Sequence, residues 1–159
     1  MRGREIGKLV GSIIACEGAG LIGSVFTTTS IPTWYAGLEK PAFTPPNTVF
    51  APVWITLYLL MGVAVYLVWR RDLAVSQVRK AFIVFWVQLV INILWTVVFF
   101  GFESLLGGVI LIIVLWIAIL LTTIWFFRVS RIAGILMIPY IAWVSIAMYL
   151  NIGVWILNT

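Results

Sequence analysis

Long runs of apolar residues, separated by short polar segments, dominate the chain. Five such runs occupy approximately residues 6–27, 48–69, 81–101, 105–127 and 132–156. An α-helix rises about 1.5 Å per residue, so each run is long enough to cross a hydrocarbon core of about 30 Å. Lipid cannot satisfy free backbone polar groups, so a spanning segment must be helical. The pattern therefore predicts an all-α membrane protein, a bundle of five transmembrane helices that forms a single domain over residues 1–159.

Basic residues are distributed unevenly around these runs. Among ten Lys and Arg residues, only Lys40 lies on the side that holds the 28–47 loop and the C-terminus. The others lie near the N-terminus and in the loops 70–80 and 128–131. The positive-inside rule then predicts a cytoplasmic N-terminus and a C-terminus outside. The net charge of +5 follows from this bias and favours contact with anionic headgroups, not nucleic acid.

The composition agrees with a membrane protein and limits the chemistry. Hydrophobic residues make up 64% of the chain, more apolar surface than a soluble domain of 159 residues could bury. There is no histidine and one cysteine, which excludes a zinc site of the His/Cys type and a Ser-His-Asp triad within one chain. We therefore predict no catalytic residues and no metal ligands. No internal repeat is evident, which argues against a transporter built from two inverted halves.

The first apolar run carries one acid and a stripe of small residues. Glu17 is the only acid deep within a span, where a carboxylate costs several kcal/mol unless it is paired or protonated. It is either a ligand-facing or proton-linked group, or a neutral hydrogen-bonding partner of another helix. Five small residues recur at intervals of four and favour close helix packing, either within the bundle or in a dimer. They are Gly7, Gly11, Ala15, Ala19 and Gly23.

The 28–47 loop is the longest connection, and it is rich in proline and aromatic residues. Proline stiffens a loop, and aromatic rings give it groups with which to pack. Two functions remain open: a lid over one end of the bundle, or anchoring of Trp34 and Tyr35 at the membrane interface. We expect Pro45 and Pro46 in the first turn of the second helix.

The third run contains a polar stripe at helical spacing, formed by Gln88, Asn92, Trp95 and Phe99. Amides in hydrocarbon need partners, so this stripe should face the bundle interior, as glue between helices or as the wall of a cavity. In the fifth run the small Ala147 leaves room for another helix or for a ligand. Deep tryptophans suit a flat aromatic guest. These are Trp54, Trp95, Trp116 and Trp143.

Several motifs follow one another in order along the chain. They are Trp34-Tyr35-x-x-Leu38-x-Lys40-Pro41, Phe50-x-Pro52-x-Trp54-x-x-Leu57-Tyr58, Gln88-x-x-x-Asn92-x-x-Trp95-x-x-x-Phe99 and Pro139-Tyr140-x-x-Trp143-x-x-x-Ala147-x-x-Leu150-Asn151. In these motifs the sequence resembles the TspO/MBR family, the tryptophan-rich sensory proteins that include the mitochondrial translocator protein. The similarity spans nearly the whole chain.

The resemblance implies a five-helix bundle with a ligand pocket that the first loop closes. Members of the family bind porphyrins such as protoporphyrin and haem, several bind sterols or benzodiazepine-type drugs, and members often form homodimers. The ligand-binding positions implied by the motifs are Trp34, Tyr35, Phe50, Ala51, Trp54, Tyr58, Asn92, Trp95, Ala147 and Leu150. We add Trp143 as a deep indole on the fifth run. Protoporphyrin or haem is expected as a ligand, with no cofactor.

Two departures from the family pattern narrow the function. Ile152 and Ile156 replace key positions of the cholesterol-recognition stretch of animal members, so we do not predict specific cholesterol binding. Ile152 also occupies the place of a second tryptophan that some bacterial relatives use to degrade porphyrin in light. We therefore predict a membrane receptor or sensor for porphyrin-like ligands. The alternatives are a transporter of such molecules and, third, a porphyrin-degrading enzyme. The basic N-terminal side favours a prokaryotic inner membrane.

Overall fold

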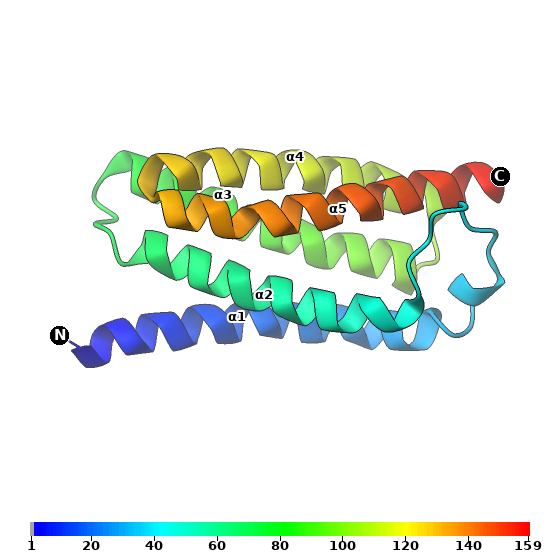
Figure 1. The fold of residues 1–159 in the computed structure, drawn as a ribbon, viewed down its shortest axis with the longest axis horizontal. Helices are drawn as coiled ribbons and strands as arrows, with labels where there is room; N and C mark the ends of the chain where they lie inside the picture. Colours follow the sequence, from blue (N-terminus) through cyan, green and yellow to red (C-terminus); the bar gives the residue numbers. More distant parts are fainter. Residues whose placement is uncertain (1) are drawn as a thin grey trace.

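A computed structural model describes residues 2–159, so Met1 of the expected domain lies outside the described residues. The long helices in this range are α1 (Arg2–Ser30), α2 (Asn47–Trp69), α3 (Ser76–Thr96), α4 (Leu105–Val129) and α5 (Arg131–Leu157) (Figure 1). Two short pieces accompany them, the 3-10 helix η1 (Tyr35–Gly37) and the π-helical turn η2 (Val97–Gly101). Five helices of the described range are long and apolar enough to cross a membrane. The predicted all-α, five-helix architecture is confirmed.

Several helices extend further than the apolar runs that predicted them. α1 continues through residues 28–30, which we expected in the loop, and α3 begins at Ser76 instead of residue 81. The Thr28 hydroxyl donates to the Ser24 carbonyl one turn earlier, at 2.7 Å, so polar side chains here support the helix. The hydrophobic pattern marks the hydrocarbon layer, whereas helices continue beyond it. Pro46 lies just before α2 in extended backbone, and Pro45 precedes it, so neither proline is within the first turn.

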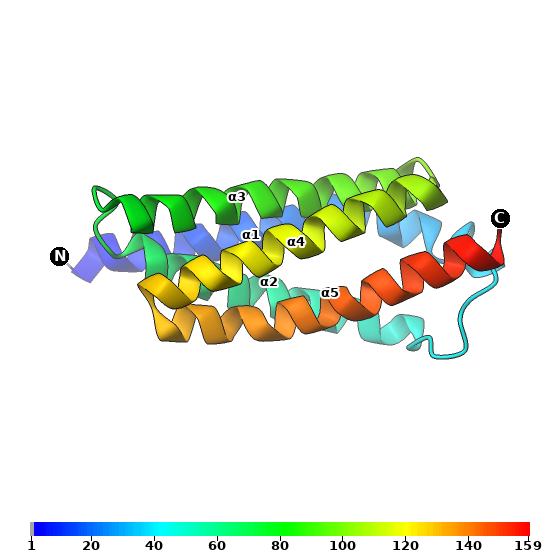
Figure 2. The same ribbon diagram turned by 90° about the horizontal axis from the view of Figure 1, so that it is seen from above.

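The five helices form a closed ring. α1 packs against α2, α2 against α5, α5 against α4, α4 against α3, and α3 back against α1. Figures 1 and 2 show the helices running roughly lengthwise, with α4 crossing over between α3 and α5. This order brings α1, α2, α3 and α5 around a common space, and α4 closes the ring on the far side.

Gly62 allows α1 and α2 to approach closely where it meets Ile13, in the first half of α1. A Cβ atom added to Gly62 would lie 2.7 Å from the Cα atom of Ile13. The small residues of α1 divide into two groups: Gly23 packs against Thr96 of α3, whereas Gly7 and Gly11 face open space. The inner part of the stripe therefore serves internal packing, and the homodimer stays a prediction.

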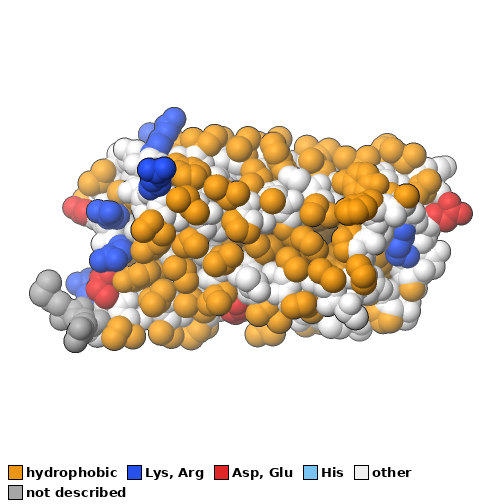
Figure 3. Space-filling view, viewed as in Figure 1, with side chains coloured by type: hydrophobic (Ala, Val, Ile, Leu, Met, Phe, Trp, Pro, Cys, Tyr) orange, Lys and Arg blue, Asp and Glu red, His pale blue; other side chains and the backbone are white. Residues whose placement is uncertain are grey.

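The two ends of the bundle differ in charge. The N-terminus and the C-terminus lie at opposite ends (Figure 1), and the basic side chains gather at the N-terminal end (Figure 3). Glu5 links α1 to α2 there, because its carboxylate lies 3.4 Å from Lys8 Nζ and 4.0 Å from Arg70 Nε. Between the ends, the face of the molecule shown in Figure 3 is largely apolar, as contact with lipid requires. The assignment of the basic end to the cytoplasm remains a prediction of the positive-inside rule.

Candidate ligand-binding cavity

A cavity of about 520 Å³ lies in the half of the bundle opposite the basic end. Its walls come from α1, α2, α3 with η2, and α5, and the segment around η1 covers its end. Aromatic rings form much of this lining, and a volume of this size is typical of small-molecule sites. The aromatic lining residues are Tyr35, Phe50, Trp54, Tyr58, Trp95, Phe99, Phe100 and Trp143.

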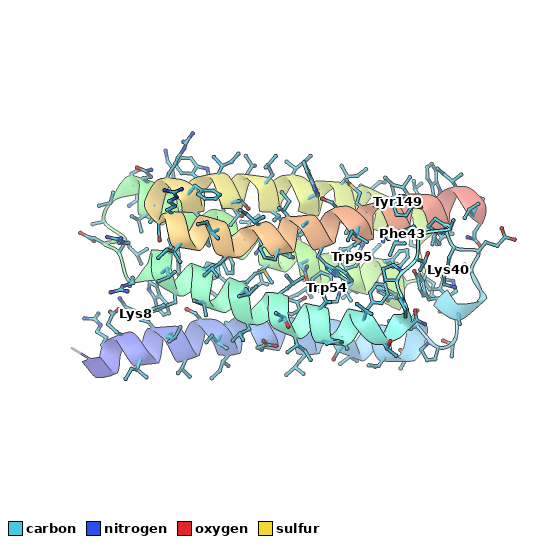
Figure 4. All side chains as sticks on the ribbon, in the orientation of Figure 1. Lys8, Lys40, Phe43, Trp54, Trp95 and Tyr149 are labelled. Carbon is cyan, nitrogen blue, oxygen red and sulfur yellow. The ribbon has the colours of Figure 1, made fainter. Side chains whose placement is uncertain are left out.

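Trp54 is at the centre of the aromatic wall. Its ring stacks on Tyr58 with centroids 5.6 Å apart and lies 6.1 Å from the ring of Trp95. Figure 4 shows Trp54 of α2 and Trp95 of α3 directed toward the space between these helices. On the α5 side, Trp143 meets Phe50 edge to face at 5.7 Å. Such pairs hold each other in fixed orientations, so the wall is organised before any ligand enters.

The π-helical turn η2 extends the aromatic wall beyond the end of α3. The Phe102 amide donates to the Val97 carbonyl five residues earlier, at 2.9 Å, which is the π-helical pattern. Phe99 and Phe100 of this turn both border the cavity, with centroids 4.8 Å apart. Phe99 also stacks on Trp95 at 6.2 Å. The wider turn thus lets two consecutive rings line the same space.

A hydrogen-bond network lies beneath the aromatic wall and joins three helices. Tyr58 of α2 donates to Asn92 Oδ1 at 2.6 Å, and Asn92 Nδ2 donates to the hydroxyl of Tyr140 on α5 at 2.9 Å. Tyr140 in turn donates to Gln88 Oε1 at 3.0 Å. Gln88 and Asn92 are fully buried. The polar stripe of α3 therefore has both expected functions: its amides join helices, while Trp95 and Phe99 form the cavity wall.

The loop over the cavity is attached to η2 and to Asn158, the residue after α5. Tyr35 lies edge to face with Phe99 at 6.3 Å, and Lys40 Nζ lies 4.8 Å from the centre of the Tyr35 ring. Burial raises the pKa of the Tyr35 hydroxyl above its usual range, so it stays protonated at neutral pH. At the C-terminal end, Asn158 Oδ1 accepts the Glu39 amide at 3.0 Å and Asn158 Nδ2 donates to the Glu39 carbonyl at 2.9 Å. The loop is therefore ordered as a cover.

We expect Asn158→Ala to loosen this cover without unfolding the bundle. The change removes both hydrogen bonds to Glu39, each worth about 1 kcal/mol at an exposed site, so opening of the loop should become several-fold more frequent. Hydrogen exchange of the loop amides should rise by that factor, while exchange in α2 and α3 stays the same. Thr159→Ala, one residue further along, is the matched control. Equal protection of the loop in both variants would contradict this function of Asn158.

The cavity reaches the outer surface between α1 and α2. Leu21 of α1 and Ile55 of α2 both border it, yet their exposed fractions are 69% and 60%. The two helices touch closely at Gly62 but leave this space further along. In a bilayer the surrounding medium at this depth is acyl chain, so the opening faces lipid.

The α1 wall was not among the predicted site residues. It contains Glu17, Leu21, Ser24, Thr28 and Ile31, together with neighbouring small or polar positions. These residues recur at intervals of three and four along α1, which places them on one helical face. Glu17 is recognisable in the sequence as a lone intramembrane acid, and the periodic polar residues after it were a signal that could have found the rest.

Nine of the eleven predicted site residues border the cavity: Tyr35, Phe50, Ala51, Trp54, Tyr58, Trp95, Trp143, Ala147 and Leu150. The other two lie one layer further away. Trp34 packs edge to face on Phe99, with ring centroids 5.4 Å apart. Asn92 lies in the buried network under Tyr58. Contact of any of these residues with a ligand stays a prediction.

Comparison with known proteins agrees with the motifs and the fold. Residues 12–156 match the model of the TspO/MBR family, which covers most of the chain. The chain belongs to the TspO/MBR family. It is therefore an integral, multi-pass membrane protein of a family that includes sensory and translocator proteins.

Three relatives illustrate the breadth of the family. The chain is 43% identical to the tryptophan-rich protein TspO of Archaeoglobus fulgidus, across 95% of this chain and 97% of the relative. It is 34% identical to the tryptophan-rich sensory protein of Cereibacter sphaeroides, across 79% and 77%. It is 36% identical to the human translocator protein, across 84% and 80%. The second name designates a sensory protein and the third a translocator protein, and none of the three names an enzymatic activity.

Proposed function

We propose that the protein is a membrane receptor or sensor that binds porphyrin-like, flat hydrophobic molecules in the cavity between α1, α2, α3 and α5. The observation that carries this proposal is the aromatic wall, with Trp54, Trp95 and Trp143 contributed by three different helices around one space. Aromatic pairs contribute about 0.5–1.5 kcal/mol each beyond the burial of their area, so stacked indoles favour a flat conjugated guest.

The shape of the site supports the same conclusion. A ligand enters from the lipid side between α1 and α2, so it needs no water-filled path. The loop held by Asn158 keeps water away from the other end. Exclusion of water strengthens the few polar contacts that a mostly apolar ligand makes.

The test is saturable quenching of tryptophan fluorescence by protoporphyrin IX in the purified protein. Ala147 borders the cavity on α5, and Ala147→Leu adds three carbon atoms to its wall. We expect this variant to bind protoporphyrin about tenfold more weakly, which corresponds to about 1.4 kcal/mol. Ala142→Leu is the matched control, because Ala142 is exposed on the same helix. Non-saturable quenching, or equal affinities of the two variants, would remove the cavity as the binding site.

Transport of the same ligands is the second candidate function. The opening toward lipid supplies one route into the cavity, and a relative in humans carries the name translocator protein. A transporter also needs a second exit and alternating access. Accumulation of porphyrin in sealed vesicles, driven by a gradient and absent without the protein, would favour transport over sensing.

A further inference from the structure

Glu17 places a carboxyl group in an otherwise mostly apolar and aromatic cavity wall. It lies near the middle of α1 (Arg2–Ser30), at the level of the hydrocarbon core, and it is the only carboxyl among the lining residues. Within residues 2–159 no hydrogen bond or ion pair engages its side chain, whereas Glu5, on the same helix, pairs with Lys8 and Arg70. An unpaired carboxylate at this depth is costly, and such residues commonly mark a functional site.

Most other polar groups of the wall are already satisfied by the protein. Ser24, Thr27 and Thr28 donate to carbonyls one turn back on α1. Asn151 accepts from Trp95 Nε1 at 3.1 Å and donates to the Ala147 carbonyl at 3.0 Å. None of these groups is a donor placed to neutralise Glu17. Its acceptor oxygens are therefore available to a molecule within the cavity.

A second unsatisfied group lies on another wall of the same cavity. Trp143 of α5 borders the cavity, and its Nε1 atom is buried with no hydrogen-bond partner. A buried N–H without a partner costs about 1–3 kcal/mol. The cavity thus presents one carboxyl acceptor on α1 without a protein partner, whereas the unsatisfied Trp143 Nε1 atom is enclosed behind the wall on α5.

We propose that Glu17 is a specificity-determining residue that binds a protonated nitrogen or an N–H donor of the ligand. This inference rests on the proposed function, and it narrows the ligand class to flat aromatic molecules with a basic nitrogen or an N–H group. A ligand that also carries carboxylates binds with these groups turned away from Glu17, toward the loop end, where Lys40 is the basic residue.

A matched pair of probes tests the proposal. 9-(Dimethylaminomethyl)anthracene is cationic at neutral pH, and 9-isobutylanthracene is its uncharged isostere. Both quench tryptophan emission, so their affinities can be measured in phosphatidylcholine nanodiscs. We expect the wild-type protein to bind the amine about tenfold more tightly than the isostere, as a charge-assisted hydrogen bond in a dry site allows. Glu17→Gln should abolish this preference and leave the affinity for the isostere unchanged.

Two further variants make the result specific. Glu103→Gln removes one carboxylate at the turn before α4, outside the cavity lining, and should keep the full preference. Glu17→Asp keeps the carboxyl group on a shorter side chain and should keep part of the preference for the amine. If Glu17→Gln preserved the preference, or if the wild-type protein showed none, the proposal would be overturned.

A third probe, protoporphyrin IX, distinguishes a failure of the Glu17 assignment from a failure of the proposed porphyrin site. Saturable binding of protoporphyrin together with equal binding of the two anthracenes, or with no binding of either, would overturn the assignment of Glu17 and leave the porphyrin site intact. Absence of binding for all three probes would overturn both. Protoporphyrin binding by Glu17→Gln also reports that this variant is folded.

Discussion

Gly62→Leu should destabilise the bundle by about 3 kcal/mol, because a side chain at this position meets backbone that cannot move aside. The first added carbon would lie 2.7 Å from Ile13 Cα and 3.1 Å from Ile13 N, closer than non-bonded atoms approach. α1 must then separate from α2 along their contact, and the wall that α1 gives to the cavity moves with it. Unfolding in mixed detergent micelles, followed by circular dichroism, measures the change.

Gly11→Leu is the control for this prediction. Gly11 lies on α1, one of the two helices that meet at Gly62, but a Cβ atom there would meet nothing within 4 Å. We expect its free energy of unfolding to stay within about 0.5 kcal/mol of the wild-type value. If both glycine variants lost the same stability, the close contact of α1 with α2 at Gly62 would not be the cause of the loss.

Asn92→Ala should cost about 2–3 kcal/mol of unfolding free energy. The change leaves the buried Tyr58 hydroxyl without its acceptor and removes the amide that donates to the Tyr140 hydroxyl. Asn92 joins Tyr58 of α2 to Tyr140 of α5 through its two amide atoms. Trp54 stacks on Tyr58, so release of the Tyr58 hydroxyl should also weaken protoporphyrin binding, although Asn92 does not border the cavity.

An exposed amide on the same helix supplies the comparison for Asn92. Gln77 of α3 makes one hydrogen bond, to the Arg128 carbonyl at 3.2 Å, and Gln77→Ala should cost less than about 1 kcal/mol. Chemical unfolding and quenching titrations on both variants give stability and affinity together. A loss of stability at Asn92 no greater than at Gln77 would show that the network contributes little to the fold.

The number and order of the helices could be predicted because hydrocarbon imposes a simple condition on sequence. Every span had to be apolar and about 20 residues long, and five runs met that condition. The helix ends were less predictable, since water and headgroups also permit helical backbone. Thr28 and Thr29 are polar and yet lie inside α1, where their hydroxyls bond to carbonyls of the preceding turn.

The candidate site could be predicted where single residues carried a strong signal. Trp54, Trp95, Trp143 and Ala147 came from aromatic content and motif resemblance, and all four border the cavity. The α1 wall was missed because Ser, Thr and Gly are also common in helix packing, so their spacing did not distinguish a cavity from a helix contact. The sequence did not show that Asn92 lies behind the cavity wall instead of within it. Its hydrogen-bond partners come from α2 and α5, so its position depends on how three helices meet.

The opening between Leu21 and Ile55 has a consequence for how strongly the protein responds to its surroundings. An oily compound distributes into the acyl layer at a concentration far above that in the aqueous phase, and the entrance samples only that layer. Two compounds that fit equally well would then differ in potency by their partition coefficients alone. For any ligand that enters by this opening, the bilayer would then serve as the first filter of selectivity.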